Sequence, residues 1–173
     1  MLRASAVALA LVAVPVLALA DVPVGSSYEA MLTAGHKLYV SGDTKGALEK
    51  YEAAKEATSG KAAAYYFIGA AKAKLGEFPE AVAALNTAAT IAGDKDVVLH
   101  AKAMFATAVV QEKSGDWDAA YDAWKKLLEY AEAHADAKTF PDSARSRIGA
   151  IERRRTLETE GAAIRSRAEN KGD

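Results

Sequence analysis

The chain has 173 residues, 51% of them hydrophobic and 26% charged, so it is long enough to bury the core of one domain. Its formal net charge is only −1, from 22 basic and 23 acidic residues, which gives no general reason to bind nucleic acid or a charged membrane surface. It contains no cysteine, which excludes disulfides, thiolate chemistry and a lipid attached to an N-terminal cysteine.

The first 20 residues have the pattern of a secretory signal peptide. Arg3 supplies a positive charge, residues 6–20 are entirely apolar, and Ala18 and Ala20 are the small residues that precede a cleavage site. The apolar stretch contains Pro15 and is shorter than the roughly 20 strongly apolar residues that span a bilayer. The pattern therefore predicts secretion across the inner membrane into the periplasm, with cleavage after Ala20; an uncleaved membrane anchor is the alternative.

Glycines and prolines divide the remainder of the chain into segments whose composition suits helices. We expect residues 21–27 to form a disordered lead. Alanine, which has the highest helix propensity, fills the segments that follow, and none of them shows the alternation of a strand. Gly42, Gly76 and Gly115 stand just past helix ends, where a left-handed cap favours glycine. The helices predicted from these signals cover residues 28–41, 45–58, 61–75, 79–92, 96–114, 117–135 and from 143 to at least 155.

A pattern of small and large residues returns three times around these glycines. A small residue lies seven positions before each glycine, an alanine lies five after it, and a large apolar residue lies nine after it. The glycines are separated by 34 and then 39 residues, a period typical of stacked helical repeats, which usually bind other proteins. The small residues are Gly35, Gly69 and Ala108, the alanines are Ala47, Ala81 and Ala120, and the large residues are Tyr51, Leu85 and Trp124.

This pattern resembles the tetratricopeptide repeat (TPR). The resemblance implies an all-α fold, a right-handed superhelical stack of about three helix hairpins over 28–135 with a C-terminal capping helix over 142–160. Residues 161–173 are expected to form a frayed tail, because Gly161 can interrupt the last helix. Lys72 and Gln111 depart from the family pattern, since an aromatic residue or leucine is expected at both positions. The alternative fold is an irregular helical bundle.

In this family the first helix of each hairpin lines a concave groove. The resemblance therefore implies a groove that is apolar and aromatic in its middle, with lysines toward the third repeat, suited to an extended peptide or an amphipathic helix. Tyr66 and Phe105 could instead be core residues. These helices lack the asparagines that would clamp a terminal carboxylate. The expected groove residues are Leu32, His36, Tyr39, Tyr66, Ala70, Phe105, Val109, Lys74, Lys102 and Lys113.

No pattern in the sequence indicates catalysis. His36, His100 and His134 show no ligand spacing, and the common metal-binding, nucleotide-binding and nucleophile motifs are absent from the sequence. We therefore expect no enzyme activity, no cofactor and no bound metal. Every arginine after Arg3 lies within residues 145–167. We interpret this basic stretch as a solvated cap face, partly paired with nearby glutamates, and an anionic partner surface is the alternative.

Together these patterns predict an exported TPR adaptor that holds a segment of a partner protein in its groove and catalyses nothing. Two other functions stay open. One is a self-assembling structural protein of the bacterial envelope, since open-ended stacks can join end to end. The other is an interaction module tethered by an uncleaved N-terminal segment. We expect no nucleic-acid partner and no membrane span in the mature form, and the thin apolar face of the cap is compatible with weak self-association.

Overall fold

The computed structural model describes residues 24–170, so the expected signal segment (1–20) and the first part of the lead lie outside the described residues. Within this range the chain forms α-helices, one short 3-10 helix and no strand, which confirms the all-α class. The helices are α1 (Val24–Ser41), α2 (Thr44–Ala57), α3 (Ala62–Leu75), α4 (Phe78–Ala92), η1 (Gly93–Lys95), α5 (Val97–Ser114), α6 (Trp117–Ala133) and α7 (Pro141–Glu169).

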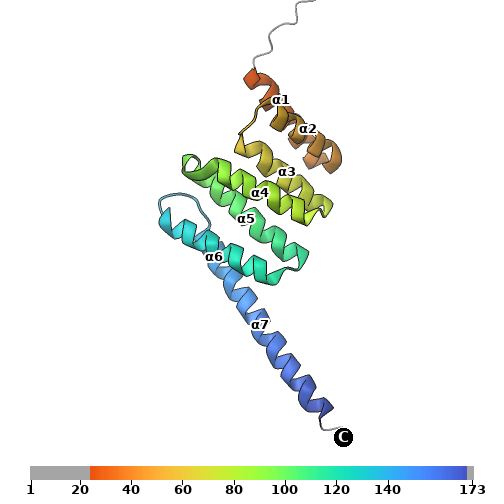
Figure 1. Ribbon diagram of the computed structural model, residues 1–173, viewed down its shortest axis with the longest axis vertical. Coiled ribbons are helices and arrows are strands. Elements are labelled where there is room, and N and C mark those ends of the chain that lie inside the picture. Colours follow the sequence, from red (N-terminus) through yellow and green to blue (C-terminus); the bar gives the residue numbers. More distant parts are fainter. Residues whose placement is uncertain (1–23, 171–173) are drawn as a thin grey trace, which may run out of the picture.

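Consecutive helices pack against one another in chain order and form a stack of hairpins (Figure 1). Helix α1 pairs with α2, α3 with α4 and α5 with α6, and each hairpin also packs on the next one. The first part of α7 packs on α6, and its second part runs away from the stack (Figure 1). The prediction of three stacked hairpins followed by a C-terminal helix is confirmed.

The turn inside each hairpin is made by a glycine in the left-handed region of backbone conformation. Gly42, Gly76 and Gly115 have φ angles of +96°, +85° and +83°, which residues other than glycine rarely adopt. Asp43 and Asp116 then cap the following helices by accepting hydrogen bonds from backbone N–H groups three residues further on, at 2.9 and 3.0 Å. Local sequence signals thus explain where these helices end and begin.

The repeated small and large residues meet inside the hairpins as the spacing predicts. A Cβ atom added at Gly35 would lie 2.6 Å from Cε1 of Tyr51, and one added at Gly69 would lie 2.6 Å from Cγ of Leu85. Only glycine therefore leaves room for these large side chains between the paired helices. The large residue of the third hairpin, Trp124, is fully buried.

A large buried cluster joins the third hairpin to the first part of α7. Trp124 and Leu127 from α6 lie at its centre, and Ala144 and Ile151 from α7 complete it. All four side chains are at most 2% exposed. Because α7 covers the apolar face that α5 and α6 leave open, it acts as the cap that a repeat stack needs at its end.

The ends of two helices differ from the expected bounds. Helix α1 begins at Val24, within the segment expected to be a disordered lead. Helix α7 continues through Gly161 to Glu169, so residues 161–169 are helical where we expected a frayed tail. The physical reason is that one glycine inside a helix costs only about 1 kcal/mol relative to alanine, and its neighbours here are alanine, glutamate and arginine, which favour helices.

Candidate functional site

Side chains from the first and second hairpins form a depression that we call the Tyr66 pocket. It has a volume of about 220 Å³ and is lined by residues of α1, α2 and α3. The lining residues are His36 and Tyr39 from α1, Tyr51 from α2, and Tyr66, Phe67 and Ala70 from α3. Four of these six belong to the groove that the TPR resemblance implied.

Aromatic contacts hold the walls of the Tyr66 pocket in place. The Phe67 ring stacks on Tyr51 at a centroid distance of 5.2 Å and meets Tyr66 edge-on at 5.5 Å. The His36 ring lies tilted beside the same Phe67 ring, at a centroid distance of 6.2 Å. Offset and edge-on arrangements are the favourable geometries for aromatic pairs, so these rings form a continuous wall of packed aromatic side chains.

The polar groups that line the Tyr66 pocket are the His36 imidazole and the hydroxyls of three tyrosines, and the Lys74 ammonium lies next to one of these rings, that of Tyr39. Burial raises the pKa of the Tyr66 hydroxyl above its usual value of 10.0, and the protonated hydroxyl can donate a hydrogen bond. The Lys74 ammonium donates to the backbone carbonyl oxygen of Tyr39 at 3.2 Å and lies 4.3 Å from the centre of the Tyr39 ring. This lysine therefore ties the end of α3 to α1.

A second depression, which we call the Phe105 pocket, lies between the third hairpin and α7. Its volume is about 580 Å³. The lining residues are Phe105, Val109 and Glu112 from α5, Trp124 from α6, and Asp142, Ser143, Ser146 and Arg147 from α7. It is more polar than the Tyr66 pocket, because α7 contributes two hydroxyls and two charged groups.

The floor of the Phe105 pocket is organised around Glu112, whose side chain is only 10% exposed. The Trp124 indole N–H donates to Oε1 of Glu112 at 2.6 Å, and Nε of Arg147 donates to the same oxygen at 2.8 Å. A second Arg147 nitrogen pairs with the other carboxylate oxygen. Phe105 packs edge-on against Trp124 with a centroid distance of 5.0 Å. Glu112 is therefore neutralised by the helix that caps the stack.

The expected groove residues do not all line one pocket. His36, Tyr39, Tyr66 and Ala70 line the Tyr66 pocket, whereas Phe105 and Val109 line the Phe105 pocket. Leu32 packs against buried core residues, and Lys74 lies at the Tyr39 ring. Lys102 and Lys113 are exposed and line neither pocket. The structure thus divides the expected set between two pockets, the core and three lysines that line neither pocket.

Several lining residues were not among the expected groove residues. Phe67 follows Tyr66 directly, and the run of aromatic residues ending at Phe67 was an available signal. Tyr51 and Trp124 were recognised only as spacers between helices, although each also forms a pocket wall. Arg147 could not be found from sequence, because its partner Glu112 lies 35 residues earlier in the chain.

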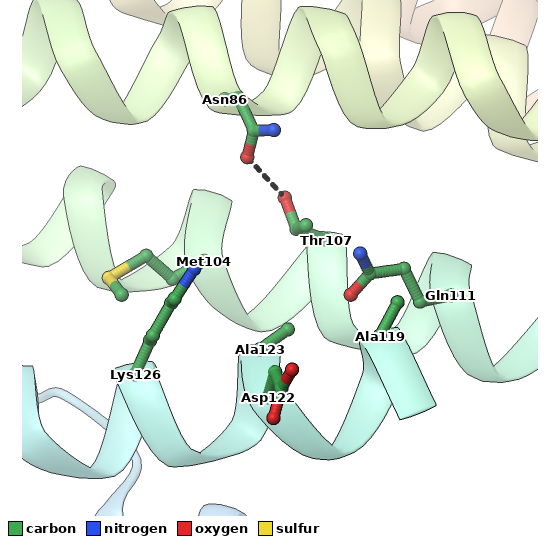
Figure 2. A pocket seen from close by; sticks show the side chains of 8 residues that line it. All are labelled: Asn86, Met104, Thr107, Gln111, Ala119, Asp122, Ala123 and Lys126. Atoms are coloured by element: carbon green, nitrogen blue, oxygen red, sulfur yellow. Dashed lines mark hydrogen bonds between the residues drawn. The ribbon is translucent and has the colours of Figure 1, made fainter. Parts of the chain in front are cut away.

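A third depression lies between α4, α5 and α6 and is markedly polar (Figure 2). Its volume is about 260 Å³, and the Thr107 hydroxyl donates to the Asn86 side-chain oxygen across it at 3.4 Å. Gln111 points its amide toward the same space, and its Oε1 is buried without a hydrogen-bond partner (Figure 2). Gln111 is one of the two positions that depart from the repeat pattern, and a polar depression is the local result.

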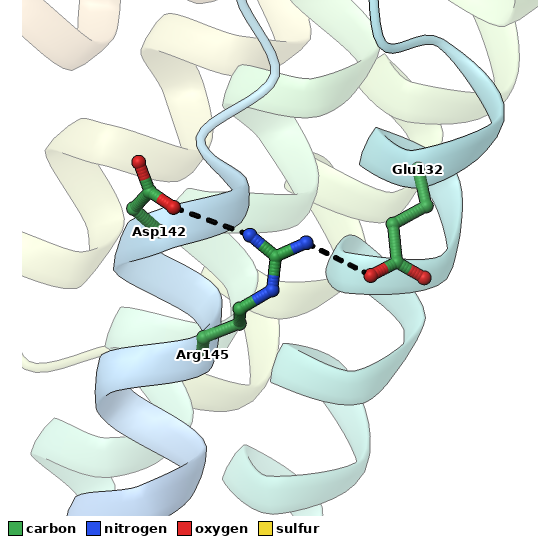
Figure 3. Close-up of polar contacts among 3 residues, drawn as sticks. All are labelled: Glu132, Asp142 and Arg145. Atoms are coloured by element: carbon green, nitrogen blue, oxygen red, sulfur yellow. Dashed lines mark hydrogen bonds and ion pairs between the residues drawn. The ribbon is translucent and has the colours of Figure 1, made fainter.

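The arginines of α7 attach this helix to the rest of the stack. Arg145 lies between two carboxylates, with Nη2 at 3.0 Å from Glu132 on α6 and Nη1 at 3.2 Å from Asp142 (Figure 3). Arg155 pairs with Asp118 of α6 at 2.5 Å. Their partners thus include acids on α6 that are remote in sequence, which the expectation of pairing with nearby glutamates did not include.

Aromatic rings of α6 add a second kind of contact to these arginines. The Arg154 guanidinium lies 4.2 Å from the centre of the Trp117 ring, and that of Arg155 lies 4.3 Å from the centre of the Tyr121 ring. Arg154 also pairs with Glu158 at 2.8 Å, as the sequence suggested. An arginine stacked on an aromatic face gains a favourable cation–π interaction. These contacts make the basic stretch, up to Arg155, part of the cap.

Two general properties of the described residues bear on function. No group of three or more histidine, cysteine, aspartate or glutamate side chains within residues 24–170 is arranged to hold a metal ion. In the same range, no helix combines the length and the apolar character that a membrane-spanning helix requires.

Comparison with solved structures identifies the fold. The N-terminal domain of stress-induced protein-1 (STI-1) from C. elegans superposes with a TM-score of 0.64 at 20% identity, covering 75% of this chain and 98% of that one. The TPR2B domain of yeast Sti1, in its pHsp70 complex, gives a TM-score of 0.63 at 20% identity, covering 74% and 98%. This protein has the tetratricopeptide-repeat fold.

A bacterial TPR-fold protein gives a similar result. The Yersinia enterocolitica type III secretion chaperone SycD, in complex with a peptide of the translocator YopD, has a TM-score of 0.61 at 18% identity and covers 73% of this chain and 93% of that one. No protein-family model and no curated protein matches the sequence. The similarity of this chain to TPR proteins is therefore detected from its three-dimensional structure and not from sequence identity.

Proposed function

We propose that this protein is an exported adaptor that binds a segment of a partner protein at the Tyr66 pocket, and that it catalyses no reaction. The observation that carries the proposal is the Tyr66 pocket, an open depression with a wall of mutually packed aromatic rings. Preformed aromatic pockets of this kind are typical anchor sites in protein interfaces.

The size and chemistry of the Tyr66 pocket suit one large apolar side chain of a partner. Its volume of about 220 Å³ accommodates a single such side chain, and the Tyr66 hydroxyl can donate to a backbone carbonyl beside it. Because the aromatic wall is already ordered, binding would cost little side-chain entropy. The exposed Lys102 and Lys113 favour acidic residues elsewhere in the bound segment.

The structural neighbours support a peptide-like partner. The TPR2B domain of yeast Sti1 was solved as a complex with pHsp70, and SycD was solved with a peptide of YopD. We extend from those proteins only the kind of ligand, a segment of another polypeptide. Less than a quarter of the residues are identical between this chain and either neighbour, so the pockets of this chain determine which segment it binds.

Blocking the Tyr66 pocket tests this function. Ala70→Arg places a long charged side chain in the pocket without removing any large core group, so we expect recovery of the partner in a pull-down from envelope extract to fall at least about tenfold. Ala53→Arg is the matched control, because Ala53 is also a half-buried helical alanine but lines a different depression, beside α2. Equal recovery with both variants would remove the Tyr66 pocket from the proposal.

The proposal of export depends on the N-terminal sequence pattern, which lies outside the described residues. A charged start, an apolar stretch and small residues before Asp21 are together typical of a cleaved signal peptide. N-terminal sequencing of the protein recovered from the periplasmic fraction tests it, and we expect a first residue of Asp21. Recovery of the protein in the membrane fraction with its first residues retained would support the tethered alternative instead.

A further inference from the structure

The second half of α7, residues 156–169, extends beyond the stack and has an uncovered apolar face. We call this segment the distal helix (Figure 1). Among the described residues of α7, Arg155 is the last that contacts α6 through an ion pair or an aromatic ring, and its partners are Asp118 and Tyr121. Leu157 and Ile164 in the distal helix are 68% and 65% exposed, and Val40 is the other large hydrophobic residue exposed to this degree in the described part of the chain.

The two large apolar residues of the distal helix, Leu157 and Ile164, lie on one face together with Gly161 and Ala168, whereas Ala162 and Ala163 lie outside this face. At 100° per residue, Leu157, Gly161, Ile164 and Ala168 fall within an arc of about 60°. The charged residues of the same segment border this arc in a regular order. Along one edge an acid precedes a base, Glu158 and then Arg165, and along the other edge Glu160 precedes Arg167.

We propose that the distal helix pairs antiparallel with the distal helix of a second copy of this chain. When Gly161 is placed beside Ile164 of the second copy, Leu157 lies beside Ala168, so each large residue meets a small one in all four layers. In this register Glu158 is level with Arg165 of the second copy to within about 3 Å along the axis, and Glu160 with Arg167. Every charge bordering the interface then faces an opposite charge, as in paired helices whose flanking residues determine the partner.

The position of the stack determines the orientation of the pair. In an antiparallel pair the two stacks lie at opposite ends of the joined helices, because α7 leaves its stack at its N-terminal end (Figure 1). A parallel pair would bring both stacks to the same end, where they would have to share the space beside residues 141–155. The antiparallel arrangement therefore allows contact along the whole distal helix without a clash between stacks.

The length of the contact sets the expected strength of the dimer. From Leu157 to Ala168 the two helices overlap over about 18 Å, or just over three turns. Such a contact buries less than the roughly 1,200 Å² of a standard protein interface, so we expect a weak dimer with a dissociation constant between about 10 μM and 1 mM.

Charge reversal tests the pairing directly by sedimentation velocity on the purified protein. We expect the wild type to pass from monomer to dimer as its concentration rises to about 1 mM. E158R/E160R alone and R165E/R167E alone should stay monomeric, because each faces like charges, whereas an equimolar mixture of the two variants should dimerise again. Circular dichroism confirms that both variants keep their helices. A monomeric wild type over this range, or a mixture that stays monomeric, would overturn the proposal.

Cysteine cross-linking tests the orientation, since the chain has no cysteine of its own. In the antiparallel pair residue 157 lies beside residue 168 of the second copy and far from the other residue 157. We therefore expect a mixture of L157C and A168C to form the mixed disulfide on oxidation, and L157C alone to form little. A disulfide-linked L157C homodimer as the main product would show a parallel pair and contradict the proposed geometry.

Discussion

At the scale of single residues, side-chain size controls how closely paired helices approach. Gly35 and Gly69 make room for Tyr51 and Leu85, and both large side chains are at most 1% exposed as a result. Interiors packed at this density do not accommodate an added methyl group without movement. The two glycines are therefore required by packing inside the helix, whereas Gly42, Gly76 and Gly115 are required by backbone conformation.

We predict that Gly69→Ala destabilises the protein by about 1–3 kcal/mol, because the new Cβ would lie 2.6 Å from Leu85 Cγ and 3.1 Å from the Ala81 carbonyl oxygen. Gly149→Ala is the control. Its Cβ would approach only the flexible end of Arg153, at 3.3 Å, so helix propensity should raise stability by up to about 1 kcal/mol. Urea denaturation measures both changes, and equal stability of the two variants would contradict the packing argument.

We also predict that stability falls as pH rises above about 10 and that Tyr66 contributes to this fall. Burial raises the Tyr66 pKa in the folded state above 10.0, so the unfolded chain ionises first and its free energy falls relative to that of the folded chain. The contribution is complete below pH 10 and is lost as pH passes the folded pKa. In Tyr66→Phe the free energy of unfolding should decline less steeply between neutral and alkaline pH than in the wild type. Identical slopes for the two proteins would contradict the predicted contribution of Tyr66.

At the scale of elements, α7 has two halves with different roles. Its first half closes the apolar cluster around Trp124 and holds α5 and α6 through Arg145, Arg147 and Arg155. Its second half has no neighbour in the described stack. Isolated helical segments of this length are marginal in water, so the distal helix gains its order from continuity with the first half or from a partner.

A matched pair of isoleucines in α7 distinguishes the two halves. Ile151→Ala should cost about 2–5 kcal/mol, because Ile151 is 2% exposed and its removal leaves a cavity beside Trp124. Ile164→Ala should change stability by less than about 0.5 kcal/mol at concentrations where the protein is monomeric, because its side chain is largely exposed. Thermal unfolding at low protein concentration compares them, and similar losses would show that the distal helix packs on the stack.

At the scale of the whole molecule, stability arises mainly from contacts between neighbouring helices. Each hairpin packs on the next, and contacts between non-consecutive helices are few in the part of the chain that the structure describes. Such a stack behaves as a series of coupled units, so its middle is held from both sides and its ends from one. The two pockets occur where such neighbouring units meet, near the first and last of these contacts.

Hydrogen exchange should show this graded stability. We predict the slowest amide exchange in α4 and α5, which have packed neighbours on both sides, and the fastest in the distal helix. Mass spectrometry measures this at a protein concentration well below the dissociation constant of the proposed dimer. Raising the concentration should then slow exchange in the distal helix alone. Uniform protection along the chain would mean that the protein unfolds as one unit rather than as a stack.

The sequence by itself determined the helices, their turns and the pairing inside each hairpin. These features depend on residues close together in the chain, namely glycines at the turns, aspartate caps and small residues opposite large ones. Tertiary structure alone decided that the expected groove residues divide between two pockets, that Glu112 is neutralised by Arg147, and that half of α7 lies beyond the stack. Each of these depends on which distant helices meet, and a local pattern of residue sizes carries no information about that.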